Sequence, residues 1–159
     1  MNLTAETYKD KLLLTKRGNN HGVFSNAKPI YVLSIIDAIA EGVIIGNKIQ
    51  FGNSELEEIY RRNYTCCQND GDSLFRANNN ITPFNMPFFH LNAEPYYHIK
   101  WLGDIVPPKQ AQSPSNKYLK ENVDFAYLDN ELWELLKHQE IRQKYRESII
   151  KKFLTNDKY

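Results

Sequence analysis

Two short segments of the chain carry residue types that could recognise a negatively charged ligand. The first places Lys28 directly before Pro29 at the start of an apolar run, and the second runs from Met86 and Pro87 to His90. A lysine holds an anion as a compact charge with three donors. Proline adds an apolar ring that has no competing N–H. This combination of residue types favours binding over catalysis.

Basic residues also flank a polar loop in the first third of the chain. Lys16 and Arg17 precede residues 18–27, which are rich in Asn and Gly, and Lys28 follows them. Such a loop can bring backbone N–H groups and cations against a phosphate. A second basic group, within residues 137–152, is mixed with acids and is interpreted as the solvated face of a helix.

A long polar stretch, residues 64–82, precedes the second segment and is expected to be an irregular loop. It contains three consecutive asparagines at residues 78–80. Asparagine side chains can hydrogen-bond to the edges of DNA bases. The alternative is that these residues belong to a plain loop without a ligand.

No arrangement of residues points to catalysis. His90 and Asn92 have the spacing of part of an HNH site, but such a site needs a ββα fold around a metal ion. The helix that would complete that fold is not expected here. Cys66 and Cys67 are adjacent, and we expect two reduced thiols rather than a strained disulfide. We therefore expect no catalytic residue, no metal site and no cofactor in this chain.

Length and composition suit one domain of ordinary size. The chain has 159 residues, of which 42% are hydrophobic, and its formal net charge is +1. Any nucleic-acid surface must therefore arise from local clustering of charge. The first residues lack the pattern of a signal peptide, and the apolar stretch 30–45 is too short and too polar to cross a bilayer. We expect a soluble cytoplasmic protein without membrane contact.

Apolar periodicity and helix-start signals predict the helices. Their expected ranges are residues 5–16, 29–42, 54–63 and 130–154, the last with a break near residues 138–139. The second range is apolar on every side and should be central to the core. Thr4 is expected to cap the first helix. Ser54 and Glu57 have the spacing of a capping box, which predicts the start of the third.

Residues 86–91 and 96–102 form the best predicted strand pair, and residues 43–51 predict a small turn or a hairpin. In a strand, Phe89 would share a face with Pro87. Both Met86 and Pro87 could line one pocket only if the chain bends where the strand begins. The expected architecture is a mostly helical α+β fold, a single domain over the 159 residues, with a small antiparallel β element packed on an apolar helical core.

The chain also contains short motifs whose order and spacing carry more weight than any one of them. In chain order they are Lys16-Arg17-Gly18, Lys28-Pro29, Gly46-Asn47-Lys48-Ile49, Pro87-Phe88-Phe89-His90-Leu91, Val123-Asp124-Phe125-Ala126-Tyr127-Leu128 and Phe153-Leu154. Over about residues 5–155 this order resembles the N-terminal DNA-recognition module of many bacterial HNH endonucleases. It is similar to the sulfur-binding domain of phosphorothioate-dependent type IV restriction enzymes. The nuclease half of that family is absent from this chain.

The resemblance implies recognition of DNA in which sulfur replaces one non-bridging phosphate oxygen. In that family a shallow apolar pocket holds the sulfur, and basic residues hold the backbone and neighbouring bases. Pro87 matches the pocket proline, Met86 stands where relatives often have an aromatic residue, and Lys28 matches the basic position before the helix proline. The chain departs from the family at Ala27, where a basic group is common, and at residues 93–97, where relatives turn through Asp-Gly.

Two hypotheses follow. The first is a non-enzymatic recognition module for double-stranded, backbone-modified DNA in a restriction or defence system. It would be the recognition half of a longer HNH endonuclease or a separate subunit that works with a nuclease. Its candidate binding residues are Met86, Pro87, Phe89, His90, Lys28 and Arg17. The alternative is a helical protein-interaction domain without a nucleic-acid ligand, favoured by the near-neutral charge and the ten tyrosines.

One structural observation can separate these hypotheses. Convergence of Lys28, Arg17 and Pro87 on one concave face favours DNA recognition. A Lys28 side chain that is buried in an ion pair favours the protein-interaction domain.

Overall fold

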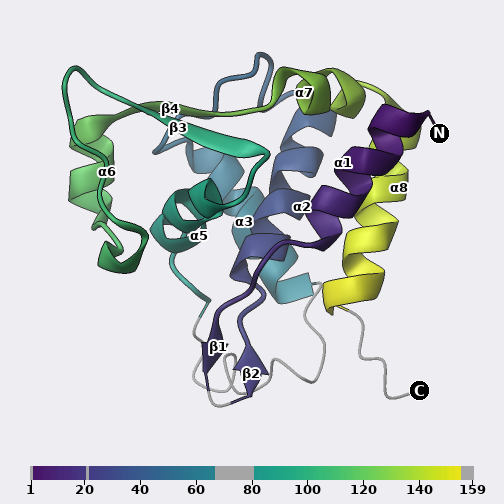
Figure 1. The fold of residues 1–159 in the computed structure, drawn as a ribbon, viewed down its shortest axis with the longest axis horizontal. Coiled ribbons are helices and arrows are strands. Elements are labelled where there is room, and N and C mark those ends of the chain that lie inside the picture. The colour runs from purple at the N-terminus through teal and green to yellow at the C-terminus, as the bar shows by residue number, and fades with distance from the viewer. Residues whose placement is uncertain (1, 21, 67–80, 155–159) are drawn as a thin grey trace.

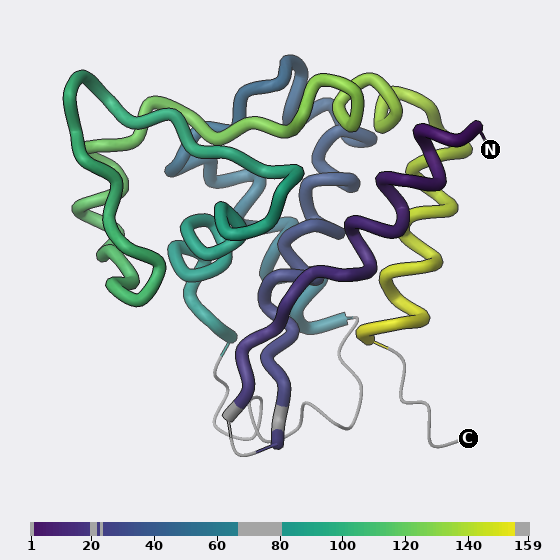
Figure 2. Tube along the Cα trace, viewed as in Figure 1, coloured from purple at the N-terminus to yellow at the C-terminus, as the bar shows by residue number. Residues whose placement is uncertain are grey.

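The apolar helix α2 (Ala27–Ala40) lies in the middle of the molecule, and the other elements pack around it (Figures 1 and 2). The computed structural model describes residues 2–20, 22–66 and 81–154. From its first residue to Ala38, α2 is buried on all sides except at the half-buried Lys28. The predicted central helix is therefore confirmed.

Helices α1, α3, α7 and α8 surround α2. Their bounds are Leu3–Leu13, Ser54–Cys66, Asn130–Leu136 and Gln139–Ile149, and a π-helical turn, η4 (Ile150–Leu154), continues α8. In Figure 1, α1 and α8 lie side by side and α3 lies behind α2. The expected break near residues 138–139 separates α7 from α8. No helix in the described part of the chain is long and apolar enough to cross a bilayer.

Two of these helices begin with a different cap from the expected one. Asn2 caps α1, where its Oδ1 accepts from the N–H of Ala5 at 2.8 Å, and Thr4 lies inside the helix. Asn53 caps α3, where its Oδ1 accepts from the N–H of Leu56 at 3.2 Å. Asparagine caps a helix as well as serine does. In both helices an asparagine that precedes the expected capping residue is therefore the actual cap.

Residues 86–91, expected as a strand, form a helix instead. Helix α5 (Asn85–His90) continues into the 3₁₀ turn η2 (Leu91–Ala93). The apolar residues at 84, 87, 88 and 91 recur at helical spacing, and all four are buried. Pro87 lies in the first turn, where its missing N–H removes no helical hydrogen bond. The strand prediction is wrong because so short an apolar run fits the two-residue period of a strand as well as the 3.6-residue period of a helix.

Strand β3 (Tyr97–Trp101) pairs antiparallel with β4 (Val123–Leu128) rather than with the segment that became α5. Along the other edge of β4, Ile49 and Ala126 exchange two backbone hydrogen bonds, at 2.7 and 2.8 Å. Of the two alternatives expected for residues 43–51, a small turn or a hairpin, the structure has the turn, because the chain bends at residues 46–47 and Ile49 pairs with Ala126 instead. The fold is a mostly helical α+β arrangement with a small antiparallel sheet, as the sequence predicts.

A second, short hairpin lies within the polar stretch expected to be a loop. Strands β1 (Asn19–Asn20) and β2 (Val23–Phe24) pair antiparallel below the start of α2 in Figure 1. Gly22 lies in their turn with a φ of 85°, a conformation that favours glycine. The connection from β3 to β4 contains the turn η3 (Gln110–Gln112) and helix α6 (Asn116–Asn122).

One buried acid ties three helices together. Asp37 of α2 is 8% exposed, and its carboxylate accepts two hydrogen bonds from Arg146 of α8, at 2.6 and 3.1 Å. Asn63 of α3 donates to the same carboxylate at 2.9 Å. Burying a carboxylate is costly without such partners. These contacts therefore fix α3 and α8 against α2.

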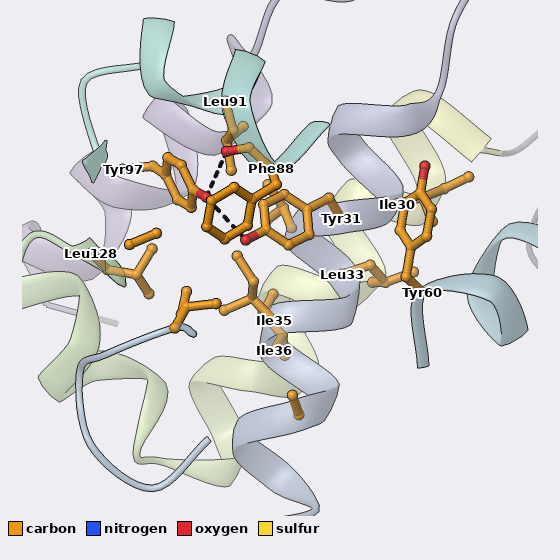
Figure 3. Close-up of a cluster of buried hydrophobic side chains, with 14 of the residues drawn as sticks. Ile30, Tyr31, Leu33, Ile35, Ile36, Tyr60, Phe88, Leu91, Tyr97 and Leu128 are labelled. Atoms are coloured by element: carbon orange, nitrogen blue, oxygen red, sulfur yellow. Dashed lines mark hydrogen bonds between the residues drawn. The ribbon is translucent and has the colours of Figure 1, made fainter. Parts of the chain in front are cut away.

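A chain of hydrogen bonds between buried groups links α2 to α5 (Figure 3). The Tyr97 hydroxyl donates to the carbonyl oxygen of Phe88 at 2.7 Å, and the Tyr31 hydroxyl lies 3.0 Å from that of Tyr97. Tyr97 has one hydroxyl hydrogen and a carbonyl can only accept, so Tyr31 donates to Tyr97. Phe88 lies in the last turn of α5, where carbonyls lack helical partners. These hydrogen bonds therefore position α5 relative to α2 and β3.

Removal of the central hydroxyl should destabilise the protein. We expect Tyr97→Phe to lower the free energy of unfolding by about 1–3 kcal/mol, because the Phe88 carbonyl and the Tyr31 hydroxyl both lose a buried partner. Chemical denaturation measures this change. Tyr127 is 36% exposed on β4, and we expect Tyr127→Phe to cost less than about 0.5 kcal/mol. Equal losses in the two variants would contradict the role given to Tyr97.

Candidate functional site

A hollow of about 430 Å³ opens between the start of α2, the base of the β1–β2 hairpin and helix α5. Three stretches of the chain line it: Lys16, Arg17, Gly18, Ser25, Ala27, Lys28, Thr82, Met86, Pro87 and His90. Its volume is in the range of small-ligand sites. The two segments with binding chemistry in the sequence both contribute to its lining.

Most of the residues that the sequence indicates line this hollow. Arg17, Lys28, Met86, Pro87 and His90 all do so. Phe89 does not, because the helical geometry of α5 turns its side chain into the core, where it is 1% exposed and packs edge-on against a tryptophan. The expected strand placed Phe89 on the face of Pro87, and that placement is wrong. The asparagines at 78–80 lie outside the described residues.

Met86 and Pro87 form an apolar wall of the hollow. Pro87 is buried and Met86 is half-buried. Successive residues of a helix are about 100° apart, so two neighbours can border one hollow without the bend that a strand would need. Pro87 contributes ring carbons and no N–H. A ligand atom against this wall meets apolar groups rather than donors.

Basic side chains supply the positive charge of the hollow. They are Lys16, Arg17 and Lys28. The Arg17 guanidinium lies 4.7 Å from the centre of the Phe24 ring and 5.0 Å from that of Phe153. It also donates to Asn26 Oδ1 at 2.8 Å. Such contacts favour one orientation of the guanidinium and leave its charge beside the hollow.

Lys28 is held in an ion pair. Its Nζ lies 3.2 Å from Glu94 Oε2, and the two side chains are 17% and 7% exposed. The same oxygen accepts the backbone N–H of Lys16 at 3.3 Å. Sequence reasoning missed Glu94, since a glutamate in a turn carries no signal until the fold brings it back to a lysine 66 residues earlier.

His90 closes one side of the hollow. Its Nε2 lies 2.9 Å from Ser113 Oγ. Burial lowers the pKa of His90, and the nearby positive charge of Lys28 lowers it further, although a hydrogen bond with Gln110 opposes both. The imidazole is therefore neutral near pH 7, where it serves as a hydrogen-bonding group rather than as another cation.

A second hollow, of about 500 Å³, is formed by residues 106–118 of the β3–β4 connection. Its lining includes three prolines and Ser113, the hydrogen-bond partner of His90. The Asn85 side chain donates to the carbonyl of Pro114 at 3.1 Å, which fixes this connection to α5. The hydrogen bond between His90 and Ser113 therefore links a lining residue of the first hollow to one of the second.

An acid–base pair lies apart from both hollows. His98 Nε2 is 2.6 Å from Asp129 Oδ1, and the Tyr8 hydroxyl donates to Oδ2 at 2.7 Å. Burial by itself would raise the pKa of Asp129, but these two hydrogen bonds and the charges of His98 and Lys11 together lower it. The three side chains join α1 and β3 to the start of α7. In the described ranges, no three His, Cys, Asp or Glu side chains gather so that they could hold a metal ion.

Comparison of the chain with protein-family models and with curated protein sequences finds no match.

The pKa of His90 gives a direct check of the hollow's geometry. In an NMR titration of the histidine ring protons, we expect His90 to titrate below its ordinary pKa of 6.5, because burial disfavours the imidazolium form. The Lys28→Gln variant should move this pKa upward by removing a nearby positive charge. The unfolded chain binds the proton more readily, so this group makes stability fall as the pH drops through 6.5.

Lys120, exposed on α6, provides the control. Lys120→Gln should leave the His90 titration unchanged. A His90 pKa at or above 6.5, or an equal response to both lysine variants, would contradict the arrangement described for His90 and Lys28.

Proposed function

We propose that this chain is a DNA-recognition module that holds the sugar–phosphate backbone of a duplex and distinguishes a phosphorothioate from an ordinary phosphate. It carries out no reaction itself. It works in the cytoplasm as part of a longer restriction nuclease or as a separate subunit beside one. The observation that carries this proposal is the meeting of Lys16, Arg17 and Lys28 with the apolar wall of Met86 and Pro87 in one hollow.

The basic residues fit the charge of a phosphate diester. Lysine and arginine contacts to phosphates supply most of the affinity of DNA-binding proteins without selecting a base sequence. Lys28 lies in the first turn of the buried helix α2, which fixes its backbone position. Lys16 and Arg17 lie in the segment between α1 and β1. A backbone phosphate in the hollow would be neutralised locally, although the whole chain has a net charge of only +1.

The apolar wall supplies the selectivity. Sulfur is larger, more polarisable and less strongly hydrated than oxygen. An ordinary phosphate oxygen placed against Met86 and Pro87 would lose hydrating water without gaining a donor, and that loss is costly. A sulfur atom at the same place loses less hydration and gains dispersion contacts with the methionine and proline side chains. The wall therefore favours the modified backbone.

The ion pair of Lys28 favours a second candidate function. A lysine that is 17% exposed and bonded to a buried glutamate can be a purely structural cation. In that case the hollow is a protein-interaction surface, and the chain is a helical interaction domain. The near-neutral net charge agrees with this alternative. The convergence of Arg17, Lys28 and Pro87 on one hollow supports DNA recognition instead, and binding measurements separate the two.

The test compares duplexes that differ in a single atom. One duplex is unmodified, and two others carry one phosphorothioate in either configuration at phosphorus. Because the wall lies on one side of the hollow, we expect one diastereomer to bind about tenfold more tightly than the unmodified duplex, which is about 1.4 kcal/mol. Fluorescence anisotropy at fixed salt measures the three dissociation constants.

A polar substitution in the wall should reduce this preference. In Met86→Gln an amide donor would face the ligand, which favours oxygen over sulfur, so the ratio of the two affinities should fall towards one. Ile45 is 86% exposed in the connection from α2 to α3, and Ile45→Gln is the matched control. Equal binding of all three duplexes to the wild type would exclude sulfur recognition. Binding to none of them would leave the protein-interaction domain as the function.

A further inference from the structure

A buried acid lies directly behind the basic side of the hollow. Glu94 lies between η2 and β3, a few residues after helix α5, which carries the apolar wall. Its side chain is 7% exposed, and Oε2 accepts from Lys28 Nζ at 3.2 Å and from the backbone N–H of Lys16 at 3.3 Å. Glu94 itself does not line the hollow, whereas both of its partners do.

These partners are groups that suit a phosphate. A lysine ammonium and a backbone N–H are typical donors to phosphate oxygens. In the free protein, the Glu94 carboxylate takes one N–H of the ammonium, which has three, and the single N–H of Lys16. An internal anion therefore already occupies donors that a bound anion would use.

In an inference that rests on the proposed function, we propose that Glu94 is an internal counter-anion that lowers the affinity of this hollow for any phosphate backbone. By neutralising Lys28 it keeps binding to unmodified DNA weak. The affinity that remains then depends more on the apolar wall of Met86 and Pro87, which is the part of the site that distinguishes sulfur from oxygen.

The charges around the hollow make this effect substantial. Lys16, Arg17 and Lys28 are the cations among its lining residues, and Glu94 offsets one of their three charges. His90 adds no charge near pH 7. Because Glu94 is almost fully buried, water and salt screen its interactions less than those of a surface acid. Its charge therefore acts on a ligand in the hollow as well as on Lys28.

A structural role for Glu94 predicts the opposite result. If the carboxylate only positioned the Lys28 ammonium for its ligand, its removal would weaken binding. If it acts as a counter-anion, removal of its charge strengthens binding. The sign of the change in affinity distinguishes the two roles.

The test variant is Glu94→Gln, which keeps the length of the side chain and an oxygen that can accept from Lys16 and Lys28. We expect its affinity for unmodified duplex DNA to rise roughly three- to tenfold, because one negative charge near the bound phosphate is removed. The slope of log K against log salt should steepen by up to about 0.9, since one more cation is available to replace a counterion. A loss of packing alone would not steepen this slope.

Glu131 provides the matched control. It is an exposed glutamate on α7, which lies at the opposite end of the molecule from the β1–β2 hairpin in Figure 1. Glu131→Gln changes the net charge by the same amount and should alter the affinity less than about twofold, because surface charges at such a distance are screened. A thermal melt of both variants verifies that they are folded.

A probe without DNA separates this inference from the proposed function. Inorganic thiophosphate can be titrated into the wild type and Glu94→Gln, and the His90 ring protons report binding in the hollow. Tighter thiophosphate binding by the variant supports the counter-anion, even if no duplex binds. The absence of duplex binding would then contradict only the proposal of DNA recognition. If the wild type binds the duplexes and Glu94→Gln binds them equally or more weakly, the counter-anion is excluded and DNA recognition stands. Failure of both proteins to bind thiophosphate or any duplex would exclude both ideas.

Discussion

The burial of helix α2 on every side is the constraint on which the rest of the structure depends. A helix with almost no solvent face needs partners all round, and α3, α5 and α8 supply many of them. Each polar group on α2 then needs a partner inside the protein. Ser34 donates to the carbonyl of Ile30, Asp37 accepts from Arg146 and Asn63, and Tyr31 donates to Tyr97. These bonds decide which surrounding elements can pack there.

The same constraint builds the hollow. The first turn of α2 carries Lys28 to the hollow, while Pro29 and Ile30 beside it are buried and anchor that turn in the core. Helix α5 packs against α2 through Phe88, and the Tyr97 hydroxyl fixes its last turn. The basic side and the apolar wall therefore lie on two elements that a common core holds in place. The proposed distinction between sulfur and oxygen would require such a fixed arrangement.

The sequence predicts the parts of this arrangement that depend on local signals. The apolar run after Pro29 marks α2, and the two segments with binding chemistry do meet at one hollow. The strand prediction for α5 fails because its few apolar residues suit both periods, and Phe89 is consequently misplaced. The structural roles of Asn47 and Glu94 could not be predicted, because each depends on a partner distant in sequence. Asn47 bonds to the backbone of Leu128, and Glu94 bonds to Lys28. Long-range contacts of polar residues leave no periodic trace.

The pairing of Lys28 with Glu94 bears on how a nearly neutral protein could select a modified backbone. A strongly basic hollow would hold every phosphate, because attraction between charges does not depend on whether sulfur or oxygen carries the negative charge. Selectivity requires that the positive charge of the site does no more than balance the negative charge of the ligand. The cost of desolvating the ligand atom against Met86 and Pro87 then determines which backbone binds more tightly. In the proposed site, Glu94 beside the cations would supply this compensation, since it takes one of the three N–H groups of the Lys28 ammonium. The low net charge and the half-buried lysine, which individually favour an interaction domain, are together what a selective site of this kind requires.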